Sequence, residues 1–279
     1  MAHLKPLAPV NPKHRVDLKD YNPASQAQLP EEATVKTLIE QHTQEIGRFQ
    51  ELLYADGSKA LLVILQGMDA AGKDGTVGKV FDHVNPMGMH VASFKSPSAV
   101  ERDHDFLWRI HQAVPPLGCI GIFNRSHYED VLVVRVHADQ LLPPHLRDAR
   151  HLWKRRYRRI NDFEQLLADN GIVILKFFLH ISRQEQRRRF VERQKNPEKH
   201  WKLAASDFQE RKFWPDYQHA YEQMLRHTST PQAPWYIIPA DHKWVRDYHV
   251  ARIVHDTLAA MKPRPRPATD PRLITMRFT

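Results

Sequence analysis

The stretch Leu61-Leu62-Val63-Ile64-Leu65-Gln66-Gly67-Met68-Asp69-Ala70-Ala71-Gly72-Lys73-Asp74 joins an apolar run to a loop of small residues. A continuous apolar run between turn signals predicts a strand, residues 61–65, that is buried on both faces of a parallel sheet. The loop that follows matches the pattern G-x-x-x-x-G-K of a phosphate-binding loop, which lies between a strand and a helix. We therefore expect a helix from Lys73 to about Val84.

The composition of this loop suits the binding of a phosphate group. Its small residues, Gly67, Ala70, Ala71 and Gly72, allow backbone N–H groups to converge on phosphate oxygens near the positive end of the helix dipole, and Lys73 adds a positive charge. After the lysine the usual pattern has a hydroxyl for Mg²⁺, whereas this chain has Asp74. Because Mg²⁺ accepts carboxylate oxygens, Asp69 could hold the metal instead. For the loop alone, a tight turn with a solvated lysine is the alternative.

Strand-like and helix-like patterns alternate along the rest of the chain. The predicted strands cover residues 61–65, 90–94, 119–124, 172–179 and 235–238, and the predicted helices cover residues 31–55, 73–84, 100–114, 147–169 and 244–261. Strands that alternate with helices imply right-handed crossovers and a parallel sheet. We therefore predict an α/β fold, a five-stranded parallel sheet flanked by helices. The 279 residues fit one large domain or two small ones.

A second polar cluster, Asn124-Arg125-Ser126-His127-Tyr128-Glu129-Asp130, follows the predicted strand 119–124. In open parallel sheets, ligands gather at the carboxyl ends of the strands. Arg125 can bridge phosphate oxygens through its planar fork, and Glu129 and Asp130 can hold a metal or orient a nucleotide. Taken alone, the cluster also fits a capped turn with internal pairs of arginine and carboxylate.

The chain divides into a central domain and two flanking segments. Residues 1–30 are rich in proline and polar residues and predict an extended arm, residues 31–261 form the domain, and residues 262–279 form a basic, proline-rich tail. Two helical stretches inside the domain, 183–194 and 206–227, follow the fourth strand. This insertion, about residues 182–228, predicts a movable helical lid above the strand ends.

The chain carries 41 Lys plus Arg against 32 Asp plus Glu, which predicts a polyanionic partner. Charge alone leaves nucleic acid, a membrane surface and a phosphorylated substrate open. Positive charge is dense in residues 147–159 and in the lid, which favours a track for a multiply charged phosphate chain, although such runs are also typical of solvated helix faces. Most lid aromatics, Trp201 among them, are expected to pack the lid helices rather than to stack on bases.

Other classes of protein are excluded by composition. The single cysteine, Cys119, rules out an internal disulfide and a cysteine-cluster metal site within one chain. The apolar run 61–65 is far shorter than the roughly 18 residues of a membrane helix, and the N-terminus lacks an apolar signal-peptide core. We therefore expect a cytoplasmic protein with no membrane partner.

Four motifs make the sequence resemble polyphosphate kinase family 2 from about residue 30 to residue 261. They are Gly67 to Gly75, Phe123 to Asp130, the lid run from Glu185 to Lys202, and Pro234 to Trp244. The resemblance implies a P-loop kinase fold, related in architecture to thymidylate kinase. It also implies Mg²⁺-dependent transfer of a terminal phosphate between inorganic polyphosphate and a nucleotide, with Mn²⁺ as an alternative ion.

Two positions of the family pattern refine the expectation. Many family members have Asp at the position of Asn124 and Asn at that of Glu129, and the version here resembles the subgroup that accepts nucleoside monophosphates and diphosphates. Such an enzyme would convert AMP to ADP and then to ATP. From the placement of charge in these motifs we expect the following roles: catalysis by Asp69, Lys73 and Arg125; phosphate or nucleotide binding by Gly67, Ala70, Ala71, Gly72, Asp74, Gly75, Asn124 and Glu129; polyphosphate binding by Arg189, Arg193 and Lys202; metal binding by Asp69, Glu129 and Asp130.

Two other functions compete with this expectation. The first is a nucleoside monophosphate kinase that uses ATP as donor and shares the phosphate loop and the lid. The second is a nucleic-acid binding protein, against which stands the lack of any RNA-binding or helix-turn-helix signature, so we expect no specific nucleic-acid partner. Family resemblance further suggests a homo-oligomer, either a dimer or a tetramer.

Overall fold

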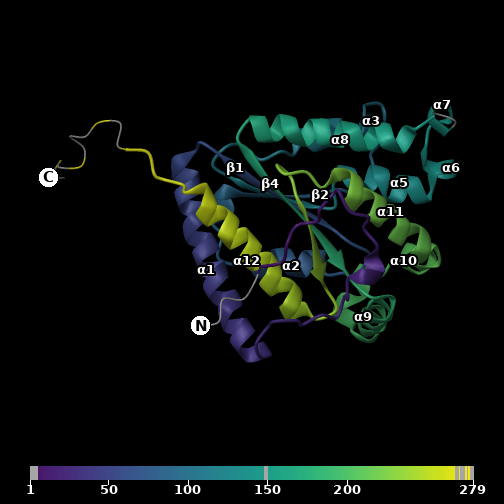
Figure 1. The fold of residues 1–279 in the computed structure, drawn as a ribbon, viewed down its shortest axis with the longest axis horizontal. Coiled ribbons are helices and arrows are strands. Elements are labelled where there is room, and N and C mark those ends of the chain that lie inside the picture. Colours follow the sequence, from purple (N-terminus) through teal and green to yellow (C-terminus); the bar gives the residue numbers. More distant parts are fainter. Residues whose placement is uncertain (1–5, 148–149, 268–269, 271–273, 275, 277–279) are drawn as a thin grey trace.

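The computed structural model describes residues 6–147, 150–267, 270, 274 and 276, and shows a five-stranded parallel sheet between helices (Figure 1). The sheet order is β2-β3-β1-β4-β5, and every neighbouring pair is parallel. The strands are β1 (Ala60–Gln66), β2 (Met89–Ser93), β3 (Ile120–Asn124), β4 (Ile172–His180) and β5 (Trp235–Pro239). The fold class predicted from the alternating pattern is confirmed.

Strand β1 lies at the centre of the sheet, and all seven of its residues are buried. It pairs with β3, where Leu65 lies opposite Asn124, and with β4, where Gln66 lies opposite Phe178. The crossover from β1 leads to β2 at one edge, whereas the crossover from β3 leads to β4 on the other side of β1. Connections that diverge in this way open a crevice at the carboxyl ends of the two strands, where ligands bind in such sheets.

Helices cover both faces of the sheet. The long helices α1 (Glu32–Asp56) and α12 (Lys243–Met261) pack on one another and on α2 (Lys73–Val80). On the other face, α8 (Leu152–Asp169) packs against β4 and α11 (Trp214–Thr228). None of the helices in the described residues is long and apolar enough to cross a membrane.

Several predicted helices are shorter than their sequence patterns indicated. Helix α2 ends at Val80 instead of near Val84. The expected helix 100–114 is two short helices, α3 (Ala99–Arg102), which begins at a capping box of Ser98 and Glu101, and α4 (Trp108–Gln112). The expected helix 147–169 is preceded by α5 (Val133–Val136), α6 (Ala138–Leu141) and α7 (Pro144–Arg147), and its main part, α8, begins only at Leu152. Residues 148 and 149 lie outside the described part of the chain.

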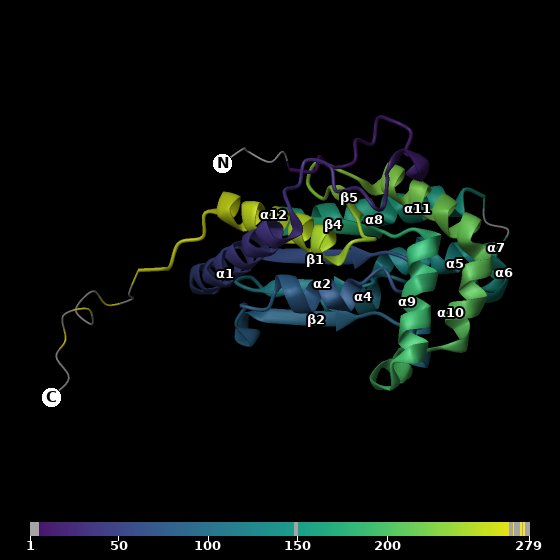
Figure 2. The same ribbon diagram turned by 90° about the horizontal axis from the view of Figure 1, so that it is seen from below.

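The predicted lid is smaller than expected. It consists of α9 (Arg183–Lys195), the 3₁₀ turn Pro197–Lys202 and α10 (Ala205–Glu210), which stand across the carboxyl ends of the strands (Figure 2). The expected helix 206–227 is broken at Arg211–Phe213, and α11 then begins with Pro215 in its first turn, where proline is tolerated. Because α11 buries Tyr221, Met224 and other side chains in the main core, it belongs to the body of the domain.

The described part of the N-terminal arm packs on its own domain. The backbone N–H of Val10 donates to the carbonyl of Trp235 at 2.8 Å, and the hydroxyl of Ser229 donates to the carbonyl of Val10 at 2.8 Å. Leu18 is buried, and its N–H donates to Glu222 Oε1 at 3.0 Å. The arm thereby covers the edge strand β5, which protects an otherwise open sheet edge.

Candidate active site

The loop after β1 curls tightly at the centre of the carboxyl edge of the sheet. A Cβ at Gly67, where φ is +157°, would lie 2.8 Å from the carbonyl oxygen of Leu179. At Gly72, where φ is +106°, it would lie 1.8 Å from Nη1 of Arg246. Both glycines are therefore required by backbone conformation and by close neighbours. The N–H of Ala71 donates to the carbonyl of Met68 at 3.1 Å, so this amide closes the turn and does not point freely at a ligand.

Lys73, the first residue of α2, is folded back into this loop. Its ammonium group donates to the carbonyl oxygen of Gly67 at 2.6 Å, and the residue is only 8% exposed. Burial, and then the nearby charge of Arg125, lower the pKa of Lys73 to about 8. The side chain thus carries a positive charge at the centre of the loop, which suits the binding of a phosphate oxygen.

Arg125 joins the two predicted polar clusters. It follows β3 with a left-handed backbone, φ +64°, and its Nη2 donates to Asp69 Oδ1 at 2.6 Å. Its Nη1 lies 3.5 Å from Glu129 Oε2. The guanidinium therefore lies between a carboxylate of the first loop and a carboxylate of the second. This ion pair brings the loops after β1 and β3 together.

Glu129 is buried beside the end of β1. It lies in a 3₁₀ helix, His127–Val131, and burial raises the pKa of its carboxyl group although Arg125 and Lys73 oppose that shift. The side-chain amide of Gln66, oriented to satisfy its neighbours, donates to Glu129 Oε1 at 3.0 Å. Glu129 therefore presents its second oxygen toward the site.

Asp130 does not join Asp69 and Glu129, contrary to the metal-ligand set that we expected. Its carboxylate lies 3.4 Å from Nη1 of Arg156 on α8, and burial raises its pKa to about 6. No group of three or more His, Cys, Asp or Glu side chains arranged to hold a metal occurs within the part of the chain that the structure describes. Asp69 and Glu129 supply carboxylate oxygens, the donor type that Mg²⁺ accepts, and Mg²⁺ usually takes further ligands from water and substrate phosphates.

The tip of the lid reaches the phosphate loop through Lys202. Its ammonium group lies 3.1 Å from Asp74 Oδ2, while Asn124 Nδ2 donates to Asp74 Oδ1 at 2.8 Å. Partial burial of Asp74 opposes these contacts, but the two hydrogen bonds prevail and lower its pKa. Asp74 therefore links the lid, the first loop and the end of β3. Gly75 is exposed in the next position of α2.

The other two lid residues expected to bind polyphosphate are placed differently from each other. Arg189 is buried, and its guanidinium donates to backbone carbonyls of the phosphate loop and of the loop after β5. It therefore differs from the free cation that we expected. Arg193 is half-buried, with its guanidinium 5.4 Å from the ring centre of Phe190.

Two residues near the site were missed by sequence reasoning. Gln186 donates to the carbonyl oxygen of Asp69 at 2.9 Å. Burial and then the charge of Asp69 raise the pKa of Asp207 on α10, although Arg193 and Arg125 oppose that shift. Asp207 therefore lies close to these charged groups. A signal for Gln186 existed, because residues three apart share a helix face, and Gln186 precedes Arg189 by three.

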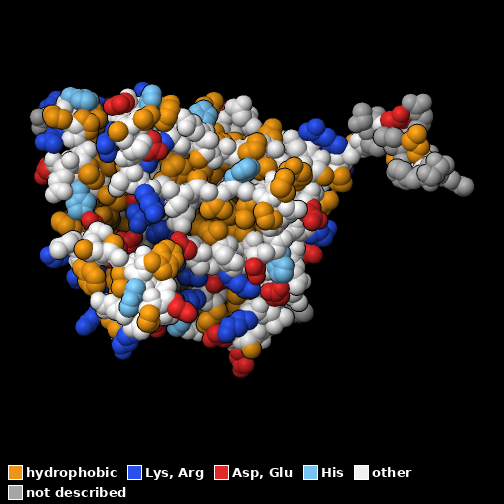
Figure 3. All heavy atoms as spheres, turned by 180° about the vertical axis from the view of Figure 1, so that it is seen from behind, with side chains coloured by type: hydrophobic (Ala, Val, Ile, Leu, Met, Phe, Trp, Pro, Cys, Tyr) orange, Lys and Arg blue, Asp and Glu red, His pale blue; other side chains and the backbone are white. Residues whose placement is uncertain are grey.

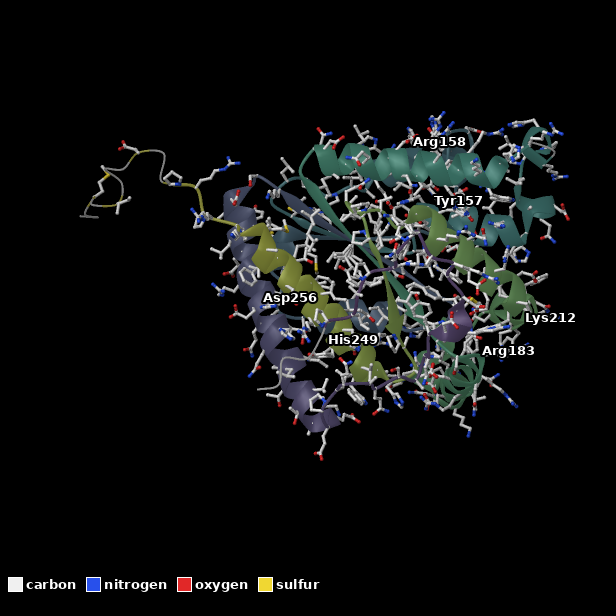
Figure 4. The ribbon with its side chains drawn as sticks, in the orientation of Figure 1. Tyr157, Arg158, Arg183, Lys212, His249 and Asp256 are labelled. Atoms are coloured by element: carbon white, nitrogen blue, oxygen red, sulfur yellow. The ribbon has the colours of Figure 1, made fainter. Side chains whose placement is uncertain are left out.

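Most of the basic run on α8 faces solvent. Lys154, Arg155, Arg158 and Arg159 are exposed, whereas Arg156 and Tyr157 are buried. In Figure 4, Arg158 lies on the outer side of α8, while Tyr157 lies on the side facing α11. The ring of Tyr157 stacks on His227 at 5.2 Å. The basic run on α8 is therefore a solvated helix face, which was the alternative to a phosphate track in the sequence analysis. Trp201, by contrast, is 77% exposed and does not pack the lid.

A buried polar network supports the second loop from below. Lys176 Nζ donates to Glu164 Oε2 at 2.5 Å, to Tyr128 Oη at 2.8 Å and to the carbonyl of Thr228 at 2.7 Å. His127 Nε2 lies 3.3 Å from Glu164 Oε1. All of these side chains are almost completely buried. Because His127 and Tyr128 precede Glu129 directly, the network fixes the turn that carries Glu129.

A phosphate loop after the central strand, an arginine after the neighbouring strand and a helical lid define a P-loop kinase fold. The family model of polyphosphate kinase 2 (PPK2) matches residues 29–266. The chain therefore belongs to the polyphosphate kinase 2 family, which confirms the resemblance seen in the motifs.

Individual relatives agree over nearly the whole chain. An AMP/ADP-polyphosphate phosphotransferase of Meiothermus ruber is 48% identical over 266 residues, 94% of this chain and 96% of that protein. An ADP-polyphosphate phosphotransferase of Rhodopseudomonas palustris is 45% identical, with 86% of each chain covered. The crystal structure of polyphosphate kinase 2 from Arthrobacter aurescens superposes with a TM-score of 0.86 at 37% identity, covering 97% of this chain and 98% of that one.

Proposed function

We propose that this protein transfers the terminal phosphate of inorganic polyphosphate to nucleoside monophosphates and diphosphates, so that AMP becomes ADP and then ATP. The observation that carries the proposal is the meeting of Lys73, Arg125 and Asp69 at the carboxyl ends of β1 and β3, under a lid whose Lys202 reaches the same loop. Relatives named for transfer between polyphosphate and AMP or ADP support this choice of substrates.

The transfer is direct and in line. An oxygen of the acceptor phosphate attacks the terminal phosphorus of polyphosphate, and the bond from that phosphorus to the bridging oxygen of the chain breaks. Because the acceptor is already an anion, the reaction requires no covalent histidine intermediate. The buried position of His127, with Nε2 directed at Glu164, agrees with this, since the ring has no access to a substrate.

The protein contributes positioning and charge. Lys73 and the loop amides hold phosphate oxygens, and Arg125 neutralises charge on the transferred group. Asp69 and Glu129 would hold Mg²⁺, or Mn²⁺ in its place, which neutralises charge on the phosphates when bound. Asp69 serves both Arg125 and the metal in this scheme, and Asp130 serves neither. Lys202 and Arg193 are the lid cations that we assign to the polyphosphate chain.

A donor assay tests this proposal. The full chain is incubated with AMP, long-chain polyphosphate and Mg²⁺ without any ATP, and the products are separated by ion-exchange chromatography. We expect ADP first and ATP later, and both products to form at least about a hundredfold more slowly with a Lys73→Met variant purified in the same way. If AMP is phosphorylated only when ATP is supplied as donor, the protein is a nucleoside monophosphate kinase and the proposal fails.

The proposal also covers the cellular setting and the assembly of the protein. Its single cysteine, Cys119, is buried and unpaired, which suits a reducing compartment, and we place the protein in the cytoplasm. We further propose a homo-oligomer, a dimer or a tetramer. Apolar side chains exposed on the face opposite to that of Figure 1 support it (Figure 3), as does the edge strand β2, where Val91 is exposed. Light scattering of the purified chain measures the assembly.

A further inference from the structure

Three consecutive carbonyl groups of the phosphate loop are held by one helix of the lid. Gln186 Nε2 donates to the carbonyl oxygen of Asp69 at 2.9 Å. Arg189 Nη1 donates to the carbonyl oxygens of Ala70 at 2.9 Å and Ala71 at 3.0 Å. Both donors come from the first half of α9, three residues apart and therefore on one face of the helix. We call this pair, Gln186 and Arg189, the loop brace.

Arg189 has no donor left for a substrate. Its Nη2 donates to the carbonyl oxygens of Ala240 at 2.6 Å and Asp241 at 2.9 Å, and its Nε donates to Glu185 Oε1 at 2.7 Å. With the two bonds from Nη1, all five N–H groups of the guanidinium are occupied. The residue is 6% exposed. Arg189 therefore connects α9 to the phosphate loop and to the loop after β5, and it does so in the protein interior.

The orientation of Gln186 is set by a second arginine. The side-chain oxygen of Gln186 accepts a hydrogen bond from Nη1 of Arg211, which lies between α10 and α11. Because Arg211 can only donate, the amide nitrogen of Gln186 must face the carbonyl of Asp69. The loop brace on α9 is therefore also connected to the turn Arg211–Phe213 that follows α10.

These contacts determine which side of the loop faces a phosphate. In a planar trans peptide the C=O and the following N–H point in opposite directions. Carbonyls of residues 69–71 that turn toward α9 therefore direct the N–H groups of Ala70 and Gly72 away from α9, while the N–H of Ala71 closes the turn. Carbonyl oxygens facing an incoming phosphate would repel it, whereas amide hydrogens attract it.

We propose that Gln186 and Arg189 are positioning residues, which hold the carbonyls of the phosphate loop away from the substrate and so keep its amides arranged for an anion. Neither side chain touches the substrate. For the identity of that anion the inference rests on the function proposed above, but the arrangement of the loop itself does not.

The first test needs no substrate. Amide hydrogen exchange of the loop 67–73 is measured in the full chain for Gln186→Met and Arg189→Lys, with Arg188→Ala as the matched control. Arg188 lies on the same helix, where it pairs with Glu185 and Glu192. Losing a buried hydrogen bond to the loop should raise local exchange by about tenfold, and Arg188→Ala should not. Exchange at the wild-type rate in both brace variants would overturn the proposal.

The second test uses tripolyphosphate as the probe, titrated without nucleotide into the same variants, with thermal melting to establish that each is folded. We expect the Kd to rise about tenfold for Gln186→Met and Arg189→Lys and to stay unchanged for Arg188→Ala. Gln186 carries no charge, so a weaker Kd in its variant reports geometry. If Arg189→Lys binds like the wild type while Arg189→Ala does not, Arg189 acts as a charge on the substrate and the proposal is wrong.

The two tests separate this inference from the proposed function. A wild-type protein that neither binds tripolyphosphate nor transfers phosphate would refute the function, and loop exchange would still decide the role of the brace. Transfer by the wild type together with unchanged loop exchange in the variants would refute the brace alone.

Discussion

The ammonium nitrogen of Lys73 lies 2.6 Å from the carbonyl oxygen of Gly67, so that the last residue of the phosphate loop closes a ring on the first. The positive charge is thereby held inside the loop instead of extending into solvent, and burial lowers its pKa to about 8. An incoming phosphate oxygen would meet a charge that is already in place. Electrostatic groups that need no rearrangement contribute most to stabilising a transition state.

Replacing Lys73 by Met should abolish most of the transfer while the fold persists. Removing a positioned charge of this kind costs on the order of 10²–10³ in rate, because the developing negative charge is left without its partner. Steady-state assays with polyphosphate and ADP measure the loss, and circular dichroism checks the fold. Lys79→Met on the same helix is the control, since Lys79 pairs with Glu40 at the surface. Near-normal turnover by Lys73→Met would remove Lys73 from the mechanism.

The pH profile should carry the signature of Lys73. With a pKa of about 8, the side chain is charged below that pH and becomes neutral above it. The value of kcat/KM for polyphosphate should therefore fall as pH rises through about 8, approaching a tenfold loss per pH unit. Phosphate groups with a second pKa near 6 are already ionised there and do not account for the decline. A profile that stays flat to pH 10 would contradict the assignment.

Metal dependence should separate the three carboxylates. Asp69→Asn and Glu129→Gln should raise the Mg²⁺ concentration needed for half-maximal activity, because each removes a charged oxygen from the site. Asp130→Asn should leave that concentration unchanged and instead lower the melting temperature, because Asp130 pairs with the buried Arg156. Magnesium titrations of activity and thermal melts provide both measurements. An Mg²⁺ requirement that shifts for Asp130→Asn would restore Asp130 to the ligand set.

Replacement by alanine should abolish activity at Gly72 and preserve it at Gly78. Gly72→Ala places a Cβ 1.8 Å from Nη1 of Arg246 at φ +106°, so the loop must distort and activity should be lost. Gly78→Ala lies in helix α2, where among the described residues a Cβ meets no atom within 4 Å. It should keep activity and gain about 0.5–1 kcal/mol of stability. Denaturant titration and activity assays of the two variants, side by side, test the difference.

Breaking the buried network should destabilise the domain. Lys176→Met leaves Glu164 buried without its cation, 2.5 Å from the lost nitrogen, and such a loss costs about 3–5 kcal/mol of unfolding free energy. The double variant Lys176→Met with Glu164→Gln should lose less, because no unpaired charge remains. Guanidinium titrations measure both. Equal losses in the two variants would show that charge pairing is not the cause.

The sheet and the phosphate loop could be predicted because their signals are local. An apolar run, a small-residue loop and a lysine occupy adjacent positions, and 61–65 with Lys73 match the strand β1 and the start of α2 within one or two residues. Helix boundaries were less accurate. Pro215 lies at the start of α11 inside the expected helix 206–227, and residues 103–107 separate α3 from α4 inside the expected helix 100–114, although the apolar spacing of both stretches looks continuous.

The roles of the charged residues could be predicted only in part. Asp69 and Arg125 were each expected at the carboxyl end of a strand, and they meet because the strand ends of a parallel sheet lie at one edge. Asp130 pairs with Arg156, and Arg189 donates to backbone carbonyls. The sequence alone does not distinguish either residue from neighbouring charged residues that could bind a metal or a substrate. A long side chain reaches whatever its element packs against, and sequence spacing does not record that.

The linear order of residues thus establishes a strand, a phosphate loop and a surplus of positive charge, all of which follow from neighbours in the chain. Which charges remain free to meet a substrate is decided by segments far apart. Arg189 donates to the carbonyl oxygens of Ala70 and Ala71, 119 and 118 positions earlier in the chain, and these bonds leave it unable to bind a substrate. Lys202, by contrast, contacts Asp74 at the surface. Burial and hydrogen bonding arise only when the chain folds, and they give Arg189 a structural role while Lys202 stays at the site.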